Sequence, residues 1–193
     1  MNVAILMLSA GSSTRMGSTK QLLPIGNKTL LGLSIENALQ TNAKKVFCVL
    51  GSNAENIKNS ISQYDIEIII NPNFKEGLSS SIVEGLNHID NTNFDAVLIM
   101  LSDQPKIDSN YINLLILSSE KHPTQIIASQ YEKTIGVPVI FPKKYFKQLQ
   151  QLEGDKGAKD FLNIHKAQVI SIKSDKLIDI DTQEDYLNFL KSL

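Results

Sequence analysis

The fold is decided within residues 3–20, which read VAILMLSAGSSTRMGSTK. The first six residues are continuously apolar, which is typical of a strand buried on both faces of a sheet. Small and hydroxyl-bearing residues follow at once, so the strand leads into a loop whose backbone N–H groups are accessible. Arg15 and Lys20 add two positive charges to this loop. Accessible amides beside two cations suit a polyphosphate, although an ordinary surface loop rich in Gly and Ser is the alternative from composition.

Apolar runs of strand length recur along the first half of the chain, at 46–50, 66–70 and 96–101. Stretches with apolar residues at helical spacing lie between them, at 30–40, 54–63 and 79–88. Because the apolar runs do not alternate with polar residues, we expect strands buried on both faces and paired in parallel. Each parallel pair needs a crossover connection, and the helical stretches supply it. The first half is therefore predicted to consist of repeated β-α units.

The alternation is looser after residue 108. We expect helices at 111–119, 142–151, 156–163 and 183–193, and strands at 125–129, 137–141 and 168–172. We find no linker, repeat or low-complexity tract, so we predict one domain over residues 1–193. The pattern predicts an α/β fold, a three-layer α/β/α sandwich around a mostly parallel sheet. Ligands of such sheets bind beyond the carboxyl ends of the strands, so a site is expected in the loops that follow strands.

Charge and cysteine content narrow the classes of function. The 19 basic and 20 acidic residues give a net charge of -1, so the whole chain has no electrostatic attraction to nucleic acid or to an anionic membrane. Cys48 is the only cysteine, which excludes an internal disulfide and a cysteine-based zinc cluster and favours a reducing compartment. No apolar stretch approaches the roughly 18 residues of a membrane span. We expect a cytoplasmic protein that binds neither nucleic acid nor membrane.

Arg15 is the only arginine among the 19 basic residues. A chain that otherwise uses lysine has a reason to use arginine where a planar, two-pronged donor is needed, as for phosphate oxygens. This composition strengthens the phosphate-binding interpretation of the first loop.

Carboxylates follow two later strands. Asp103 leaves the strand expected at 96–101, where it is well placed to hold Mg²⁺ against a triphosphate. The alternative, that Asp103 caps the next helix, is weaker because Asp108 or Ser109 lies at a better position for a cap. Near the C-terminus, Asp179 and Asp181 fall on one face of a short extended segment. A role in the site and capping of the last helix explain these carboxylates equally well.

The segment from Asn71 to Ser81 ends in three consecutive serines at an expected helix start. Their hydroxyls can cap the helix, contact a ribose or a base, or bind an anion, and capping accounts for only one of them. The histidines are scattered without metal spacing, and no arrangement for covalent catalysis is evident.

These motifs resemble a known family. The opening signature consists of LSAG at 8–11, RMG at 15–17, and Lys20 followed by LLP at 22–24. It resembles the start of the MobA-like nucleotidyltransferases, Rossmann-like enzymes of the nucleotide-diphospho-sugar transferase type that join a nucleotide to a phosphorylated acceptor and release pyrophosphate. The resemblance implies that Arg15 grips the β- and γ-phosphates and that Lys20 faces the α-phosphate. The implied nucleotide-binding residues are Leu8, Ser9, Ala10, Gly11, Ser12, Arg15, Lys20, Asn71, Gly77 and Ser80.

The resemblance also implies a metal site and three catalytic residues. The SDQP segment at 102–105 is similar to the family's loop that bears the magnesium aspartate, which makes Asp103 the metal ligand. The IDIDTQED segment at 178–185 is similar to the family's C-terminal block and suggests Asp181 as a second ligand, with Asp179 as its rival. The catalytic residues implied are Arg15, Lys20 and Asp103, with Mg²⁺ as the cofactor.

Two further blocks point to one subgroup, the molybdenum cofactor cytidylyltransferases (MocA-like). They are the NP and EGLSSS sequences within 71–81, and GDKGAK at 154–159 after the PVIF strand. The expected reaction is transfer of CMP from CTP to a molybdopterin-type phosphate acceptor, and a molybdoenzyme would receive the product. The chain departs from the subgroup at Ile135-Gly136-Val137 and at Lys159, where the acceptor is expected, and at Gln183, which affects only a helix start. Alternatives are transfer of GMP to the same cofactor, transfer of a nucleotide to a sugar or polyol phosphate, and a non-catalytic cofactor carrier.

Overall fold

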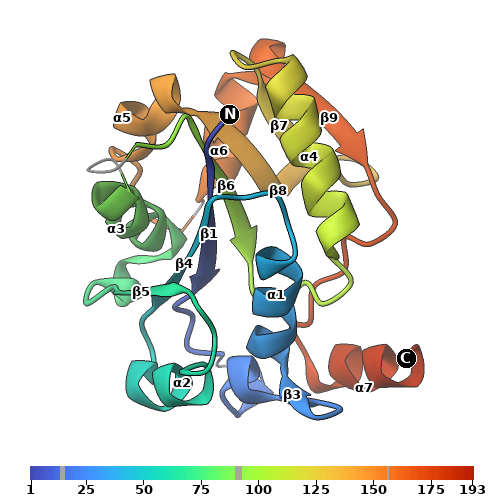
Figure 1. Cartoon of the computed structure of the whole chain (residues 1–193). Coiled ribbons are helices and arrows are strands. Elements are labelled where there is room, and N and C mark those ends of the chain that lie inside the picture. Colours follow the sequence, from blue (N-terminus) through green and yellow to red (C-terminus); the bar gives the residue numbers. More distant parts are fainter. Residues whose placement is uncertain (14–15, 90–92, 156) are drawn as a thin grey trace.

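A seven-stranded sheet forms the centre of the molecule (Figure 1). The computed structural model describes residues 1–13, 16–89, 93–155 and 157–193. The strand order is β5-β4-β1-β6-β8-β7-β9. The strands are β1 (Val3–Ser9), β4 (Lys45–Leu50), β5 (Glu67–Ile70), β6 (Ala96–Leu101), β7 (Ile126–Gln130), β8 (Ile135–Pro142) and β9 (Val169–Lys173). Only β8 runs antiparallel to its neighbours, β6 and β7, so the prediction of a mostly parallel sheet is confirmed.

Helices cover both faces of the sheet. They are α1 (Leu30–Leu39), α2 (Ala54–Ser60), α3 (Leu78–Ile89), α4 (Ser109–Lys121), α5 (Phe146–Leu149) and α6 (Ala158–Ile164), whereas α7 (Gln183–Lys191) lies outside these two layers. All seven residues of β1 are buried, and successive residues point to opposite faces. Ile5 packs in the cluster that includes side chains from α1, α2 and α4, whereas Leu6 packs in the cluster that includes side chains from α3, α5 and α6. This is the predicted three-layer sandwich.

A small hairpin and α7 lie together beside this sandwich. The hairpin strands are β2 (Pro24–Ile25) and β3 (Lys28–Thr29), which the sequence analysis did not predict. Ile25, Leu30 and Ile180 form a third apolar cluster with side chains from α7. The last helix is therefore anchored near the first loop of the chain, although the two are far apart in sequence.

Two elements differ from their predictions. The strand at 66–70 was expected to be buried on both faces, but β5 is an edge strand and Ile70 is 46% exposed. Apolar composition alone does not reveal where a strand stands in the sheet order. The helix expected at 142–151 is a 3-10 turn, Lys143–Tyr145, followed by the single α-helical turn of α5.

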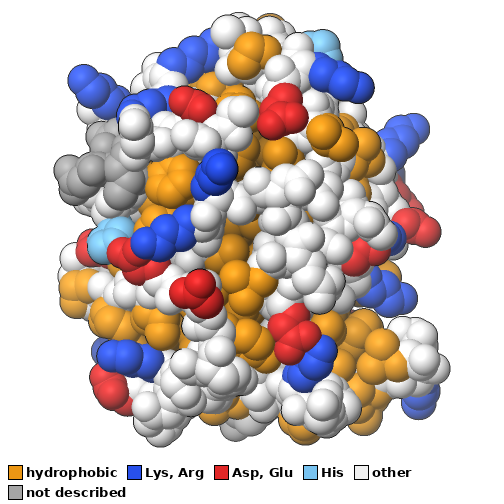
Figure 2. Space-filling view, in the orientation of Figure 1, with side chains coloured by type: hydrophobic (Ala, Val, Ile, Leu, Met, Phe, Trp, Pro, Cys, Tyr) orange, Lys and Arg blue, Asp and Glu red, His pale blue; other side chains and the backbone are white. Residues whose placement is uncertain are grey.

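The surface has mixed charge. On the face shown in Figure 2, acidic and basic side chains are interspersed among apolar ones, in line with the net charge of -1. None of the helices in the described parts of the chain is both long and apolar enough to cross a membrane.

Candidate functional site

A cavity of about 600 Å³ opens where the C-terminal ends of β1 and β6 meet. Its walls come from the loop after β1, the segment that leads into α3, the loop after β6 and, from farther along the chain, Asp155 and Asp181. This is the edge of the sheet at which ligands of parallel α/β folds bind. The Oγ atoms of Ser9 and Ser102, 2.9 Å apart, join the loops that follow β1 and β6.

Lys20 lies between two carboxylates of this cavity. Its Nζ atom is 2.7 Å from Oδ2 of Asp103 and 3.0 Å from Oδ1 of Asp181. Burial alone would lower the pKa of Lys20, but the charges and hydrogen bonds of the two aspartates outweigh burial and raise this pKa above its ordinary value. The ammonium group therefore stays charged at neutral pH.

Three contacts bring Asp181 to this position. The backbone N–H of Ile180, which is fully buried, donates to the carbonyl oxygen of Asp103 at 2.9 Å. Thr182 caps α7 in a reciprocal capping box with Asp185, whose carboxylate also accepts the backbone N–H of Asp181. The capping role that the sequence offered for this segment is thus taken by Thr182, and the adjacent Asp181 is left to face Lys20.

Asp179 faces a different partner from Asp181. Its Oδ1 atom accepts from Nε2 of Gln104 at 2.7 Å, and the same amide nitrogen lies 2.7 Å from the hydroxyl of Tyr131. Burial raises the pKa of Asp179, while the hydrogen bond from Gln104 acts in the opposite direction. Of the two rival carboxylates, Asp181 forms the ion pair with Lys20 and lines the cavity.

Gln21 holds the first loop in shape, a role that the sequence analysis missed. Its Nε2 atom donates to the carbonyl oxygens of Ser9 at 3.0 Å and Gly11 at 3.1 Å, and its Oε1 atom accepts from Oγ of Ser13 at 3.3 Å. Ser13 has a positive φ of 53°, so the loop adopts a shape that side chains disfavour. In the sequence, Gln21 is marked only by its place between Lys20 and the apolar Leu22, which does not reveal its backbone partners.

Most of the predicted nucleotide-binding residues are brought together. Lys20, Gly77 and the five residues from Leu8 to Ser12 line the cavity. Asn71 and Ser80 do not line it, although they are connected to it: Nδ2 of Asn71 donates to Oγ of Ser80 at 2.9 Å and to Oγ of Ser81 at 3.0 Å. Ser81, which does line the cavity, was not selected from the sequence. Arg15 lies outside the described residues, so its predicted role stays a prediction.

The carboxylates fit a magnesium-type ion. Oδ1 of Asp103 is buried and has no hydrogen-bond partner among the described residues. An unpartnered buried carboxylate oxygen is costly unless a cation or a donor reaches it. Magnesium typically takes one or two protein carboxylates and completes its shell with phosphate oxygens and water, which matches the pair of Asp103 and Asp181. Within the described ranges, no group of three or more His, Cys, Asp or Glu is arranged to hold a metal by itself.

Comparisons with known proteins identify the family to which this sequence is similar. The family model described as MobA-like NTP transferase domain matches residues 5–169. The chain is 26% identical over 192 residues to the purine catabolism protein PucB of Bacillus subtilis (strain 168), covering 94% of this chain and 92% of PucB. It is 26% identical over 166 residues to nicotine blue oxidoreductase of Paenarthrobacter nicotinovorans, covering 81% of this chain and 79% of that protein.

A solved structure shares the fold over nearly the whole length. Rv0371c from Mycobacterium tuberculosis H37Rv matches with a TM-score of 0.87 and 25% identity, covering 99% of this chain and 98% of that one. The same mycobacterial protein has also been solved in complex with manganese, and that structure matches with a TM-score of 0.84 and 24% identity, covering all of both chains.

Proposed function

The chain belongs to the family of MobA-like NTP transferase domains, a family of nucleotidyltransferases, and from this premise we propose that it transfers CMP from CTP to a molybdopterin-type phosphate acceptor. The observation that carries the proposal is the cluster of Lys20, Asp103 and Asp181 in the cavity at the end of β1. A cationic group beside two carboxylates is what a triphosphate and its metal ion require of a protein.

The reaction exchanges one phosphoanhydride bond for another. An oxygen of the acceptor's terminal phosphate attacks the α-phosphorus of the nucleotide and forms a new P–O bond, while the bond to the bridging oxygen of the β-phosphate breaks and pyrophosphate leaves. A phosphate monoester is largely ionised at neutral pH, since its second pKa is about 6. The protein therefore needs no general base, but it must align two mutually repelling anions.

Lys20 and the first loop would meet that need. The charged Nζ atom would stabilise the negative charge that gathers on the α-phosphate, and the loop after β1 would offer backbone N–H groups to the other phosphates. Gln21 would keep these groups in position through its bonds to Ser9 and Gly11. Arg15 is proposed to add the two-pronged contact to the β- and γ-phosphates.

Asp103 and Asp181 would hold the Mg²⁺ ion. When bound, such an ion neutralises phosphate charge and orients the leaving group. The manganese complex of Rv0371c is an instance of a divalent cation bound by a protein of this fold.

The choice of CTP rests on the first loop. Ala10 stands where guanylyl-transferring relatives tend to have a second glycine, and its methyl group takes up room in the cavity. Ala10 also packs against Gly51, since a Cβ atom added to Gly51 would lie 2.9 Å from Cβ of Ala10. A pyrimidine fits this reduced space better than a purine, so GTP is the second choice.

The choice of acceptor rests on the later blocks of the sequence. The blocks at 71–81 and 154–159 resemble the molybdenum cofactor subgroup, but Ile135 and Val137 are apolar where that subgroup carries polar residues, and both pack against the core. Transfer to a sugar or polyol phosphate is therefore the alternative acceptor chemistry. The names of PucB and of nicotine blue oxidoreductase describe different processes, so they do not narrow the choice.

The test is a matrix of substrates. The purified protein with Mg²⁺ would be given each of the four nucleoside triphosphates together with molybdopterin, and then with sugar and polyol phosphates, and pyrophosphate would be assayed. Release only with CTP and molybdopterin supports the proposal, and release with a sugar phosphate supports the alternative acceptor. Binding of molybdopterin without pyrophosphate in any mixture would contradict catalysis and support a carrier.

A further inference from the structure

We propose that Gln104 is a positioning residue of the site. Through Asp179 it holds the segment before α7 in register with the loop after β6, so that Asp103 and Asp181 can share one divalent cation. This role rests on the proposed function, since it takes these two aspartates as the metal ligands. Three consecutive residues, 179–181, each contact a different partner at the end of β6 or in the first loop.

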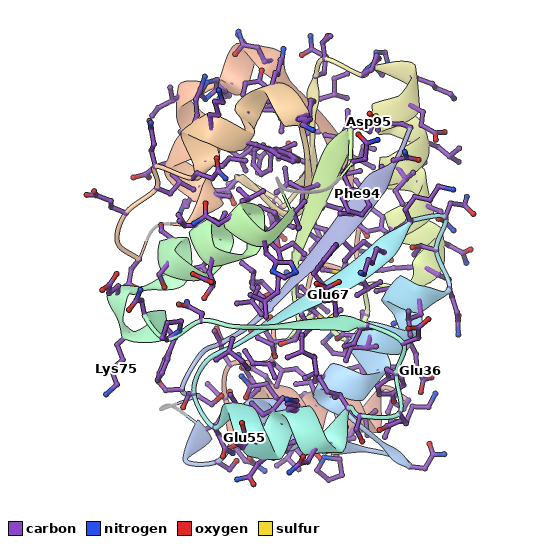
Figure 3. All side chains as sticks on the ribbon, turned by 60° about the vertical axis from the view of Figure 1, so that its left-hand side comes forward. Glu36, Glu55, Glu67, Lys75, Phe94 and Asp95 are labelled. Carbon is purple, nitrogen blue, oxygen red and sulfur yellow. The ribbon has the colours of Figure 1, made fainter. Side chains whose placement is uncertain are left out.

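The two carboxylates lie close enough together to share one cation. The Nζ atom of Lys20 is within hydrogen-bond distance of both Asp103 and Asp181, so a single positive charge already reaches the pair. Lys75 also lines the cavity, but it is exposed and its side chain extends away from the molecule in Figure 3. A divalent cation can be bound by both aspartates only if Asp181 keeps this position relative to Asp103.

The loop after β6 supplies the fixed side of this arrangement. The backbone N–H of Ser102 donates to the carbonyl oxygen of Leu8 at 3.3 Å, which ties the start of the loop to β1. Farther along, the backbone N–H of Ile107 donates to the carbonyl oxygen of Gln104 at 3.1 Å. Nδ2 of Asn37 in α1 donates to the carbonyl oxygen of Ile107 at 3.0 Å. The side chain of Gln104 therefore leaves from a part of the loop that is held on both sides.

The segment before α7 is the side that needs an attachment. Residues 174–182 form neither helix nor strand, so no regular ladder of hydrogen bonds fixes their position. The backbone N–H of Ile180 bonds to the loop after β6 at 2.9 Å, but a single bond lets the segment turn about it. The bond from Gln104 to Asp179, one position earlier, is a second point of attachment. Two adjacent attachments fix the direction in which the next side chain, Asp181, leaves the backbone.

The amide of Gln104 acts as a donor to both of its partners. The hydroxyl of Tyr131 donates its own proton to the carbonyl oxygen of Val137 at 2.7 Å, so its oxygen is left to accept. The ionised carboxylate of Asp179 can only accept. Both partners therefore require the Nε2 atom of Gln104, whose two hydrogens are then in use.

The other end of this amide indicates what the side chain is for. Gln104 is 1% exposed, and its Oε1 atom is buried without a hydrogen-bond partner among the described residues. Burial of such an oxygen costs free energy, and a leucine of similar volume would avoid that cost. Only the amide can make the bonds to Asp179 and Tyr131. Residues that hold metal ligands in place typically change metal affinity by about 10- to 100-fold when they are mutated.

The competing explanation is that Asp179 acts by its charge, and a set of variants separates the two roles. Gln104→Leu and Asp179→Ala remove the hydrogen bond from either side. Asp179→Asn removes the charge but keeps an oxygen that can accept from Gln104. Asn37→Leu is the matched control, because it removes a side-chain bond to the same loop without touching the segment before α7.

Binding of Mn²⁺ alone, followed by electron paramagnetic resonance, is the first measurement. We expect Gln104→Leu and Asp179→Ala each to bind Mn²⁺ about tenfold more weakly than the wild type. Asp179→Asn and Asn37→Leu should stay within about threefold of the wild type. The double variant Gln104→Leu/Asp179→Ala should bind no more weakly than either single variant, because both substitutions remove the same bond.

Hydrogen exchange of the Ile180 N–H is the second measurement and needs no metal. Exchange should be about tenfold faster in Gln104→Leu and Asp179→Ala than in the wild type, and unchanged in Asp179→Asn. The inference is overturned if Asp179→Asn binds Mn²⁺ as weakly as Asp179→Ala, or if Ile180 exchanges at the wild-type rate in Gln104→Leu. If the wild type binds no Mn²⁺ or releases no pyrophosphate, the proposed function fails, and exchange at Ile180 still decides the role of Gln104.

Discussion

The ammonium group of Lys20 joins carboxylates that lie 83 and 161 positions away in the sequence. If this charge stabilises the reacting α-phosphate, Lys20→Ala should slow pyrophosphate release by roughly 10²-fold or more. Lys28→Ala is the matched control. It removes the ammonium group of a hairpin residue that is paired with Glu36 of α1, and it should retain turnover. Circular dichroism would check that both variants fold. A Lys20→Ala protein that turns over at the native rate would remove Lys20 from the mechanism.

Gln21 gives a second prediction for a single residue. Gln21→Leu keeps the volume but loses three hydrogen bonds that hold the first loop. We expect the KM for CTP to rise about tenfold, because the phosphate-binding amides lose their fixed positions. Gln151→Leu, at an exposed position, is the control. An unchanged KM in Gln21→Leu would show that the loop keeps its shape without this side chain.

The sequence indicated which charged residues belong to the site better than it indicated which hydrogen bonds the polar residues form. Lys20 and Asp103 could be selected because charged residues in loops after buried strands are conspicuous. Asp181 was selected from the resemblance of its segment to the family's C-terminal block. Ser81 could not be distinguished from Ser80, because only the folded chain shows which of the two lines the cavity. Gln21 was missed because its partners are mostly backbone carbonyls, which no side-chain pattern reveals.

At the scale of elements, α3 approaches β1 unusually closely. A Cβ atom on Gly85 would lie 2.6 Å from Cδ2 of Leu6, which is fully buried. Gly85→Ala should therefore lower the free energy of unfolding by about 1–3 kcal/mol, although alanine is otherwise the better helix former. Urea denaturation followed by circular dichroism measures this.

Gly32→Ala in α1 is the matched comparison. Its added Cβ would lie 2.8 Å from the hydroxyl oxygen of Tyr64, the far end of a partly exposed side chain that can move. We expect the free energy of unfolding to change by less than about 1 kcal/mol. Equal losses in the two variants would mean that the contact with Leu6 is not the cause.

The positions of most helices and strands could be predicted from the sequence, but the order of the strands in the sheet could not. Long periodic segments such as α3 and α4 were identified from apolar spacing with boundaries close to those observed. The β2-β3 hairpin was missed because two-residue strands have no period to detect. The edge position of β5 depends on strand order, which an apolar run does not encode.

For the whole molecule, stability should decline at alkaline pH. Burial raises the pKa of the Cys48 thiol to about 12, and burial, with a contribution from Asp179, raises that of Tyr131 to about 12. Above their ordinary values of about 8.5 and 10, these groups ionise in the unfolded chain but keep their protons in the folded one. The unfolded state then binds fewer protons, so the free energy of unfolding falls as pH rises.

Urea denaturation at pH 8 and pH 10.5 tests this. Cys48 should account for a loss of about 2 kcal/mol and Tyr131 for less than about 1 kcal/mol. The loss between the two pH values should be smaller in Cys48→Ala and slightly smaller in Tyr131→Phe than in the wild type. Because each variant is compared at pH 10.5 with the same variant at pH 8, the change in the free energy of unfolding that the substitution causes at both pH values cancels. If the wild type and both variants lost the same free energy of unfolding, Cys48 and Tyr131 would not be the cause of the loss.

The three-layer architecture followed from the alternation of apolar runs and amphipathic stretches, because a parallel sheet needs crossover helices. The antiparallel insertion of β8 between β6 and β7 was not predicted, because strand direction leaves no trace in composition. The organisation of residues 1–193 as one domain stays a prediction.

The backbone hydrogen bond between Ile180 and Asp103 has a consequence for folding during translation. Folding during translation begins with the N-terminal part of a chain, so the first loop and Asp103 leave the ribosome long before the segment that carries Asp181. A nascent chain has Lys20 and only one of its two carboxylate partners until the segment before α7 emerges. The site is thus assembled last, when almost every residue that surrounds it has already been made.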